Sequence, residues 1–116
     1  MSAMDVTNQT PIGWVKYWKP KDDWYYLTPA ERQTYLDNFA RVTRAAMEKG
    51  ARLLGTYKCR GQSPWARFEV WEFPELQAVI ELTNNLEEIG HFRYFAEDHT
   101  VGTRYERTGS ADSWVI

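Results

Sequence analysis

One histidine lies where an imidazole could work as an acid or a base. His91 follows Gly90 near the expected end of a helix, and an unperturbed imidazole pKa of about 6.5 suits proton abstraction near neutral pH. Tyr57 and Tyr105 lie on expected strands and could donate hydrogen bonds to a developing oxyanion. The alternative is that His91 simply packs against neighbouring rings at a half-exposed helix end. We take His91, Tyr57 and Tyr105 as the candidate catalytic residues.

Aromatic side chains are unusually abundant in this chain of 116 residues. They make up 16% of it, as six Trp, seven Tyr and five Phe. Large rings can line a pocket for a flat ligand, or they can fill a core and an interface between subunits. For any single Trp we expect the core, but we expect at least two rings to line a cavity. The candidate ligand-binding residues are Trp14, Trp18, Trp24, Tyr25, Trp71, Phe92 and Phe95.

Charged residues also occur inside the expected strands, where they alternate with apolar ones. Cross-strand ion pairs at a solvated edge are each worth about 0.2–1 kcal/mol, and we favour that interpretation for Lys58 and Arg67. A buried glutamate could instead bind a polar group of a substrate, so Glu69 and Arg104 stay open. The residues with this pattern are Lys16, Lys58, Arg67, Glu69, Glu72 and Arg104.

Several common kinds of site have no motif in this sequence. There is no glycine-rich phosphate loop, nucleophile elbow, zinc-protease helix or paired CxxC motif. His91 and His99 lie eight residues apart without the thiolates or carboxylates of a metal site. The single cysteine, Cys59, is expected to act as a small core residue. We therefore expect no metal and no cofactor.

The charge balance and hydropathy restrict the partners and the location. Fourteen Lys and Arg stand against sixteen Asp and Glu, a formal net charge of −2, whereas nucleic-acid binding requires a basic excess. No apolar run is long enough to span a bilayer, and the first residues lack the features of a secretory signal. We expect a cytoplasmic protein that binds neither nucleic acid nor membrane.

Local signals predict the elements that must position these residues. Thr28 and Glu31 have the spacing of a capping box, and Gly50 is a typical helix stop, so a helix is predicted over 28–49. Apolar spacing predicts a second helix over 74–95, with a kink at Gly90. Alternation predicts four strands, over residues 13–19, 51–59, 65–73 and 100–107.

The resulting order of elements is β-α-β-β-α-β, that of the α+β ferredoxin-like fold. It predicts one domain over residues 13–108, between tails at 1–12 and 109–116, with two helices on one face of a four-stranded antiparallel sheet. The strands carry apolar residues for the other face too, and a chain this short has nothing left to cover it. We therefore expect a two-fold homodimer that packs sheet against sheet.

Residues 68–97 carry a family resemblance. They read FEVWEFPELQAVIELTNNLEEIGHFRYFAE, with a Trp71-Glu72 pair ending the third strand and a segment His91-Phe92-Arg93 near the helix end. This pattern resembles the dimeric α+β barrel superfamily, especially its antibiotic-biosynthesis-monooxygenase-like branch. The segment WYYLTPAER is similar to the darcynin-like branch.

The resemblance leaves the reaction open, because the superfamily includes oxygenases, decyclising lyases, isomerases, polyketide cyclases and haem proteins. Its haem-degrading members pair an axial His with an Asn on the first strand and a Trp ten residues before the His. Here the stretch Trp14–Trp18 holds no Asn, and Glu81 stands ten residues before His91. Haem degradation is therefore disfavoured, and haem binding through His91 is open but disfavoured as well.

Two functions of different classes follow. The first is an enzyme, of oxygenase, cyclase or isomerase type, that acts on a small aromatic or polyketide-like molecule with His91 as the general base and no nucleotide cofactor. The second is a non-catalytic dimeric module that binds a hydrophobic ligand or haem. An open cavity between helices and sheet, with His91 and a tyrosine hydroxyl facing it, would favour the enzyme.

Overall fold

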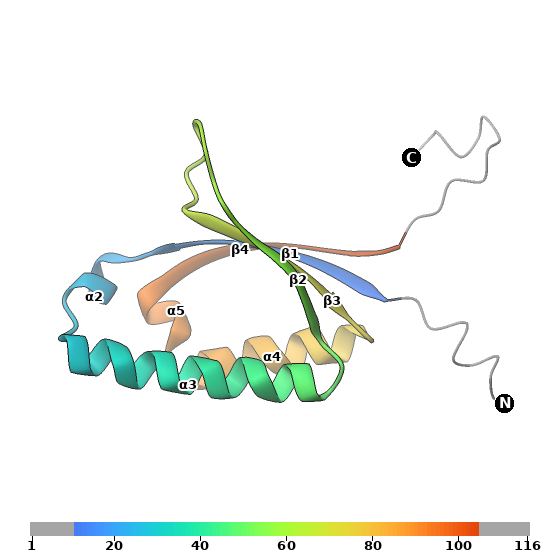
Figure 1. Cartoon of the computed structure of the whole chain (residues 1–116), viewed down its shortest axis with the longest axis horizontal. Coiled ribbons are helices and arrows are strands. Elements are labelled where there is room, and N and C mark those ends of the chain that lie inside the picture. Colours follow the sequence, from blue (N-terminus) through green and yellow to red (C-terminus); the bar gives the residue numbers. More distant parts are fainter. Residues whose placement is uncertain (1–10, 105–116) are drawn as a thin grey trace, which may run out of the picture.

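The computed structural model describes residues 11–104 and has the α+β ferredoxin-like fold (Figure 1). Most of the two expected tails and Tyr105 lie outside the described residues, so the domain limits stay a prediction. The elements in order are β1 (Ile12–Pro20), α2 (Asp22–Tyr25), α3 (Pro29–Glu48), β2 (Arg52–Lys58), β3 (Arg67–Phe73), α4 (Leu76–Glu88), α5 (His91–Tyr94) and β4 (Phe95–Thr103).

The four strands form one antiparallel sheet in the order β2-β3-β1-β4. Figure 1 shows α3 and α4 on one side of this sheet, while the other side carries no helix. In the register, Lys16 of β1 lies opposite Glu69 of β3 and also opposite His99 of β4. The inner strand β1 therefore carries a charged side chain between two other polar ones.

The start of α3 is the capping box that the sequence predicts. Thr28 Oγ1 accepts a hydrogen bond from the Glu31 backbone N–H at 3.1 Å, and Glu31 Oε1 accepts one from the Thr28 N–H at 2.8 Å. The hydrogen bond from the Thr28 backbone lowers the pKa of the Glu31 carboxyl. Pro29 occupies the first helical turn, where its missing N–H has no cost.

The second predicted helix and the fourth strand differ from the prediction. The helix over 74–95 is divided into α4 and the one-turn α5, because Gly90 adopts the left-handed conformation with φ of 78° and ends α4. The strand β4 then begins at Phe95 instead of residue 100, which places His99 in a strand. The break at Gly90 is what turns His91 inward and makes room for the longer strand.

A bulge changes the direction of side chains along β2. Strict alternation would put Leu53 and Tyr57 on one face, but the register shifts between Leu53 and Gly55. Leu53 consequently lies opposite Trp71, whose side chain is buried beneath the helices. Tyr57 lies opposite Phe68 and belongs to the face without helices.

The main core fills the space between α3, α4 and the sheet. Its buried residues are Trp14, Val42, Ala51, Trp71, Phe73, Val79, Leu82 and Leu86. Within residues 11–104, no helix combines the length and the apolar character needed to cross a membrane.

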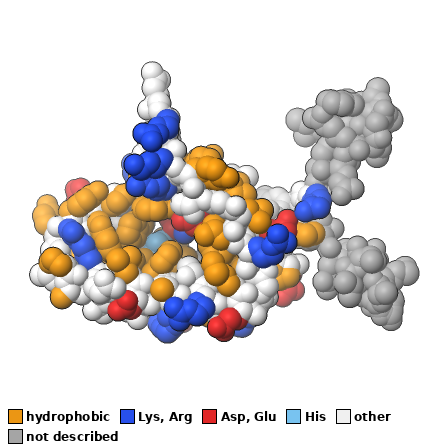
Figure 2. Space-filling view, in the orientation of Figure 1, with side chains coloured by type: hydrophobic (Ala, Val, Ile, Leu, Met, Phe, Trp, Pro, Cys, Tyr) orange, Lys and Arg blue, Asp and Glu red, His pale blue; other side chains and the backbone are white. Residues whose placement is uncertain are grey.

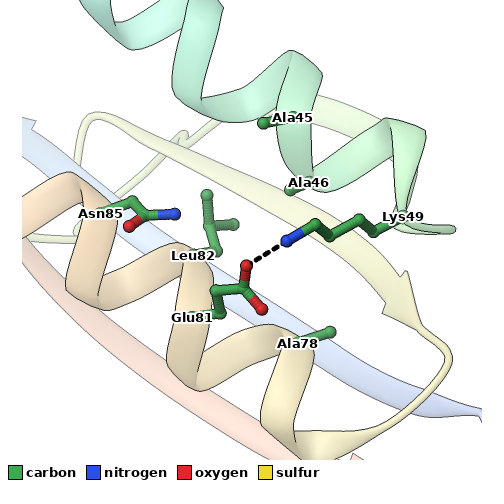
Figure 3. A pocket seen from close by; sticks show the side chains of 7 residues that line it. All are labelled: Ala45, Ala46, Lys49, Ala78, Glu81, Leu82 and Asn85. Carbon is green, nitrogen blue, oxygen red and sulfur yellow. Dashed lines mark hydrogen bonds and ion pairs between the residues drawn. The ribbon is translucent and has the colours of Figure 1, made fainter.

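A shallow hollow lies on the outside, between α3 and α4 (Figure 3). It encloses about 60 Å³, and its rim carries an ion pair between Lys49 and Glu81, which are 63% and 44% exposed. A space of this size holds one or a few waters rather than an organic ligand.

Candidate functional site

A larger cavity of about 220 Å³ lies between α3 and the sheet. In Figure 2 a histidine side chain is visible in a hollow framed by hydrophobic side chains. The walls of the cavity are mostly apolar, with one carboxylate and one imidazole among them. Its lining residues are Trp18, Tyr35, Leu36, Phe39, Glu69, His91 and Phe95.

Aromatic rings and hydrogen bonds fix the His91 side chain in this cavity wall. It lies in α5 directly after the break at Gly90 and is 4% exposed. Its ring stacks on Phe39 and on Phe95, with centroids 5.6 and 5.1 Å away. The Nδ1 atom is hydrogen-bonded to the Tyr35 hydroxyl, and Nε2 is hydrogen-bonded to the Glu97 carboxylate.

Glu97 decides which nitrogen of His91 carries the proton. Burial would raise the pKa of Glu97, but hydrogen bonds from His91 and His99 and the positive charge of Lys16 outweigh burial and lower it to about 2. The ionised carboxylate can only accept, so Nε2 of His91 donates the proton. In the neutral imidazole, Nδ1 then carries the lone pair and accepts from Tyr35.

Tyr35 completes a buried chain of three side chains. Its burial and the nearby negative charge of Glu97 raise the pKa of its phenol, which therefore stays protonated and donates to His91. An imidazole held through one nitrogen by a carboxylate, with a hydroxyl on the other, is the arrangement by which catalytic triads make histidine a base. The chain Tyr35–His91–Glu97 can therefore move a proton at the cavity wall.

The ammonium group of Lys16 lies beside the hydrogen-bonded side chains Tyr35–His91–Glu97. The Lys16 ammonium, 3% exposed, lies 3.5 Å from Glu97 Oε2 and 3.6 Å from Glu69 Oε1. Glu69 also accepts hydrogen bonds from the indole N–H groups of Trp18 and Trp71, both at 2.9 Å. Lys16 is thus part of a buried network, whereas the sequence pattern fitted an edge strand just as well.

Five of the residues proposed from the sequence gather around this site. Trp18 and Phe95 line the cavity together with His91. Phe92 packs edge-on against the His91 ring at 5.1 Å, and Trp24 packs on Phe95 at 5.0 Å. Phe92 and Trp24 thus contact residues of the cavity wall without lining it.

Four other proposed residues lie elsewhere. Trp14 and Trp71 belong to the core, at 0% and 2% exposure, and Tyr25 is 62% exposed on α2. Tyr57 is half exposed on the face of the sheet without helices, away from His91. Tyr105 falls outside the described residues, so its predicted role has no structural account.

Two residues of the site were not predicted from the sequence. Tyr35 fits the apolar spacing of α3, and its hydroxyl on a buried helix face is the signal that could have marked it. Glu97 was not predicted as a site residue because the fourth strand was expected to begin at residue 100. With β4 starting at Phe95, alternation puts Phe95, Glu97 and His99 on the same face.

Comparisons with known proteins give a family and a fold. The model of a family of unknown function, DUF6616, matches residues 13–114. No curated protein matches the chain.

Solved structures with this fold include two variants of chlorite dismutase from Candidatus Nitrospira defluvii, one of them in complex with cyanide. They are 18% and 14% identical, with TM-scores of 0.66 and 0.70, and cover 81% and 97% of this chain. This chain spans only 40% and 48% of their length. The methylated RPA0582 protein, 12% identical with a TM-score of 0.62, is covered over 89% of its length and covers 90% of this chain.

These likenesses confirm the α+β ferredoxin-like fold, and membership of the dimeric α+β barrel superfamily stays a prediction. The antibiotic-biosynthesis-monooxygenase-like or darcynin-like branch stays a prediction. The expectation of no cofactor is contradicted, because the chlorite dismutases with this fold are haem-binding proteins.

The residues of this chain nevertheless do not fit haem as they are arranged here. Both ring nitrogens of His91 are engaged, and His99 gives its Nε2 to Glu97 and does not line the cavity. The cavity is also smaller than the ~300–1,000 Å³ of pockets for drug-sized ligands. Between residues 11 and 104, no group of three or more His, Cys, Asp or Glu side chains is placed to hold a metal ion.

Proposed function

Because the chain belongs to DUF6616, a family of unknown function, we propose its function from the site: the protein binds a small aromatic or similarly apolar molecule and removes a proton from it with His91. The observation that carries this proposal is the buried hydrogen-bonded chain Tyr35–His91–Glu97 at the wall of an apolar cavity. Oxygenases, cyclases and isomerases that work on acidic C–H or O–H groups share proton removal as a first step.

The roles of the side chains follow from their hydrogen bonds. The ligand's proton passes to Nδ1 of His91, and Glu97 stabilises the resulting imidazolium through the Nε2–H bond. The Tyr35 hydroxyl, released from Nδ1, donates to the ligand oxygen on which negative charge collects. Tyr35 thus takes the role that we expected of Tyr57 or Tyr105.

Partly filling the cavity is expected to weaken binding. Leu36 lines the cavity and is 44% exposed, and Ile80 on α4 is 42% exposed but does not line it. Leu36→Phe should weaken binding of 2-indanone, a small aromatic ketone, by at least about fivefold, since overpacking typically costs about 1–3 kcal/mol. Ile80→Phe should leave binding unchanged.

The measurement is the fluorescence of Trp18 and the other tryptophans during titration with the ketone. The proposal predicts a saturable change for the wild type and for Ile80→Phe. Equal affinities for the two variants would contradict binding in this cavity. Saturable binding without exchange of the ketone's protons would contradict the catalytic role and support a non-catalytic ligand-binding module.

We also propose a homodimer that forms through the sheet face without helices. The centre of this face carries partly exposed apolar side chains: Tyr17 and Tyr57 pack on Phe68, with centroids 5.5 and 4.9 Å away. Val15 and Val70 lie opposite each other beside them. Exposed apolar surface of this kind favours association, and a two-fold axis lets the same patch pair with itself.

A charge in the centre of this face should dissociate the dimer. Val70→Asp places an unpaired carboxylate in the interface, whereas Ile80→Asp places one on the helix side. Light scattering should give a dimer mass for the wild type and for Ile80→Asp, and a monomer mass for Val70→Asp. Circular dichroism checks that both variants are folded. A monomeric wild type at micromolar concentration would refute the dimer.

A further inference from the structure

Glu69 presents a carboxylate to the cavity and shares its neighbouring ammonium group with a second carboxylate. It lines the cavity wall, and its side chain is 11% exposed. Two of its hydrogen-bond donors, the indole N–H groups of Trp18 and Trp71, are neutral. Its cationic neighbour, Lys16, is 3.6 Å away and is shared with Glu97. A ligand in the cavity therefore meets a nearly buried anion.

The lysine and glutamate charges of this network do not balance. Lys16 contributes one positive charge, while Glu69 and Glu97 contribute two negative charges, and the imidazoles of His91 and His99 hydrogen-bond to Glu97 rather than to Glu69. A buried charge without a full counter-charge is costly. A cation bound in the cavity beside Glu69 would restore the balance, whereas an anion would increase the excess.

The rest of the cavity wall also suits a cation. Aromatic faces attract ammonium groups within about 6 Å of the ring centroid. Lys16 already lies in such surroundings, with its ammonium 5.7 Å from the Trp14 ring and 5.5 Å from the Phe39 ring. Four rings line the cavity around the glutamate: Trp18, Tyr35, Phe39 and Phe95.

We propose that the ligand of this cavity is a small aromatic amine in its protonated form, whose ammonium group pairs with Glu69 between the rings. This inference rests on the proposed function, since it names the substrate class of the same site. The ammonium would anchor one end of the molecule at Glu69. Its apolar body would lie against Phe39 and Phe95, where His91 can reach a proton.

Three probes of nearly equal shape test the charge preference: benzylamine, benzyl alcohol and benzoate, titrated against tryptophan fluorescence at neutral pH. We expect benzylamine to bind about 10-fold more tightly than benzyl alcohol, the ratio expected of a partly desolvated cation–π and ion-pair contact. Benzoate should bind most weakly. Equal or weaker binding of benzylamine relative to benzyl alcohol would overturn the proposal.

Two variants assign the preference to residues. Glu69→Gln should bring the affinities for benzylamine and benzyl alcohol to within about twofold of each other, because the amide carries no charge. Phe39→Leu keeps the carboxylate and removes one ring. It should therefore weaken the binding of benzylamine more than the binding of benzyl alcohol. This variant replaces Glu69→Gln in the test if Glu69→Gln does not fold. A preference that both folded variants retain would rule out this site.

The outcomes separate this inference from the function beneath it. If benzyl alcohol binds but benzylamine is not preferred, the inference is wrong and the proposed function stands. If none of the three probes binds, both are wrong. Binding of benzylamine by His91→Gln with the wild-type preference would support the anchor at Glu69 independently of the proton transfer.

Discussion

Replacing Lys16 with methionine is expected to lower the free energy of unfolding by about 3–5 kcal/mol, the usual cost of removing one partner from a buried ion pair. Methionine is similar in length and fits an apolar site, so the loss comes from charge rather than from packing. Without the ammonium, Glu69 and Glu97 lie on the two strands that flank β1 with no lysine between their carboxylates. Urea unfolding followed by circular dichroism measures the change.

Lys58→Met is the matched control for this prediction. Lys58 is exposed on β2 and lies opposite Arg67, so its charge has no buried carboxylate to balance. Its replacement should change the free energy of unfolding by no more than about 0.5 kcal/mol, as is usual for surface positions. A loss below about 1 kcal/mol for Lys16→Met would mean that the buried network contributes little, because pairs at the surface are worth that much.

His91→Gln is expected to slow proton removal by roughly 10²–10⁴-fold, the usual worth of a positioned general base. Glutamine can still bridge Tyr35 and Glu97 by hydrogen bonds, but its amide does not take up a proton at neutral pH. It is preferable to alanine because His91 is buried between Phe39 and Phe95, where a cavity would also destabilise the fold. The exchange of deuterium from D₂O into 2-indanone, followed by NMR, measures the rate.

His99→Gln is the matched control, because His99 binds the other oxygen of the Glu97 carboxylate. His99 Nε2 donates to Glu97 Oε1 at 2.7 Å, but the side chain is 28% exposed and does not line the cavity. Its replacement should slow exchange far less than His91→Gln, because only an indirect contact to the base is lost. Equal decreases in the exchange rate of the two variants would contradict the role of His91 as the base. A wild-type exchange rate in His91→Gln would contradict it as well.

The sequence by itself determined the class of fold. The capping residues Thr28 and Glu31 and the alternating strands act over a few residues, so their signals can be read without knowing the rest of the structure. Together with the order of elements they predict the α+β ferredoxin-like fold, which is confirmed. The chemistry of single side chains, an imidazole and aromatic rings, indicated His91, Trp18 and Phe95 as site residues, and these three line one cavity.

The tertiary structure alone decided how the site is built. Gly90 marked a kink in the sequence, but only packing shows that the chain reverses there and starts β4 at Phe95, which brings Glu97 beside β1. Tyr35 and His91 are 56 residues apart, and no local pattern pairs them.

The position of Lys16 has the same explanation. An alternating strand with a lysine fits either a solvated edge or the centre of a sheet, and local spacing does not distinguish the two. The order β2-β3-β1-β4 places β1 between two strands, and the register sets Lys16 opposite Glu69 and His99. Helices then close over that face and bury the charges. Element type is encoded by neighbours along the chain, whereas the contacts of a buried network depend on register and packing between distant segments.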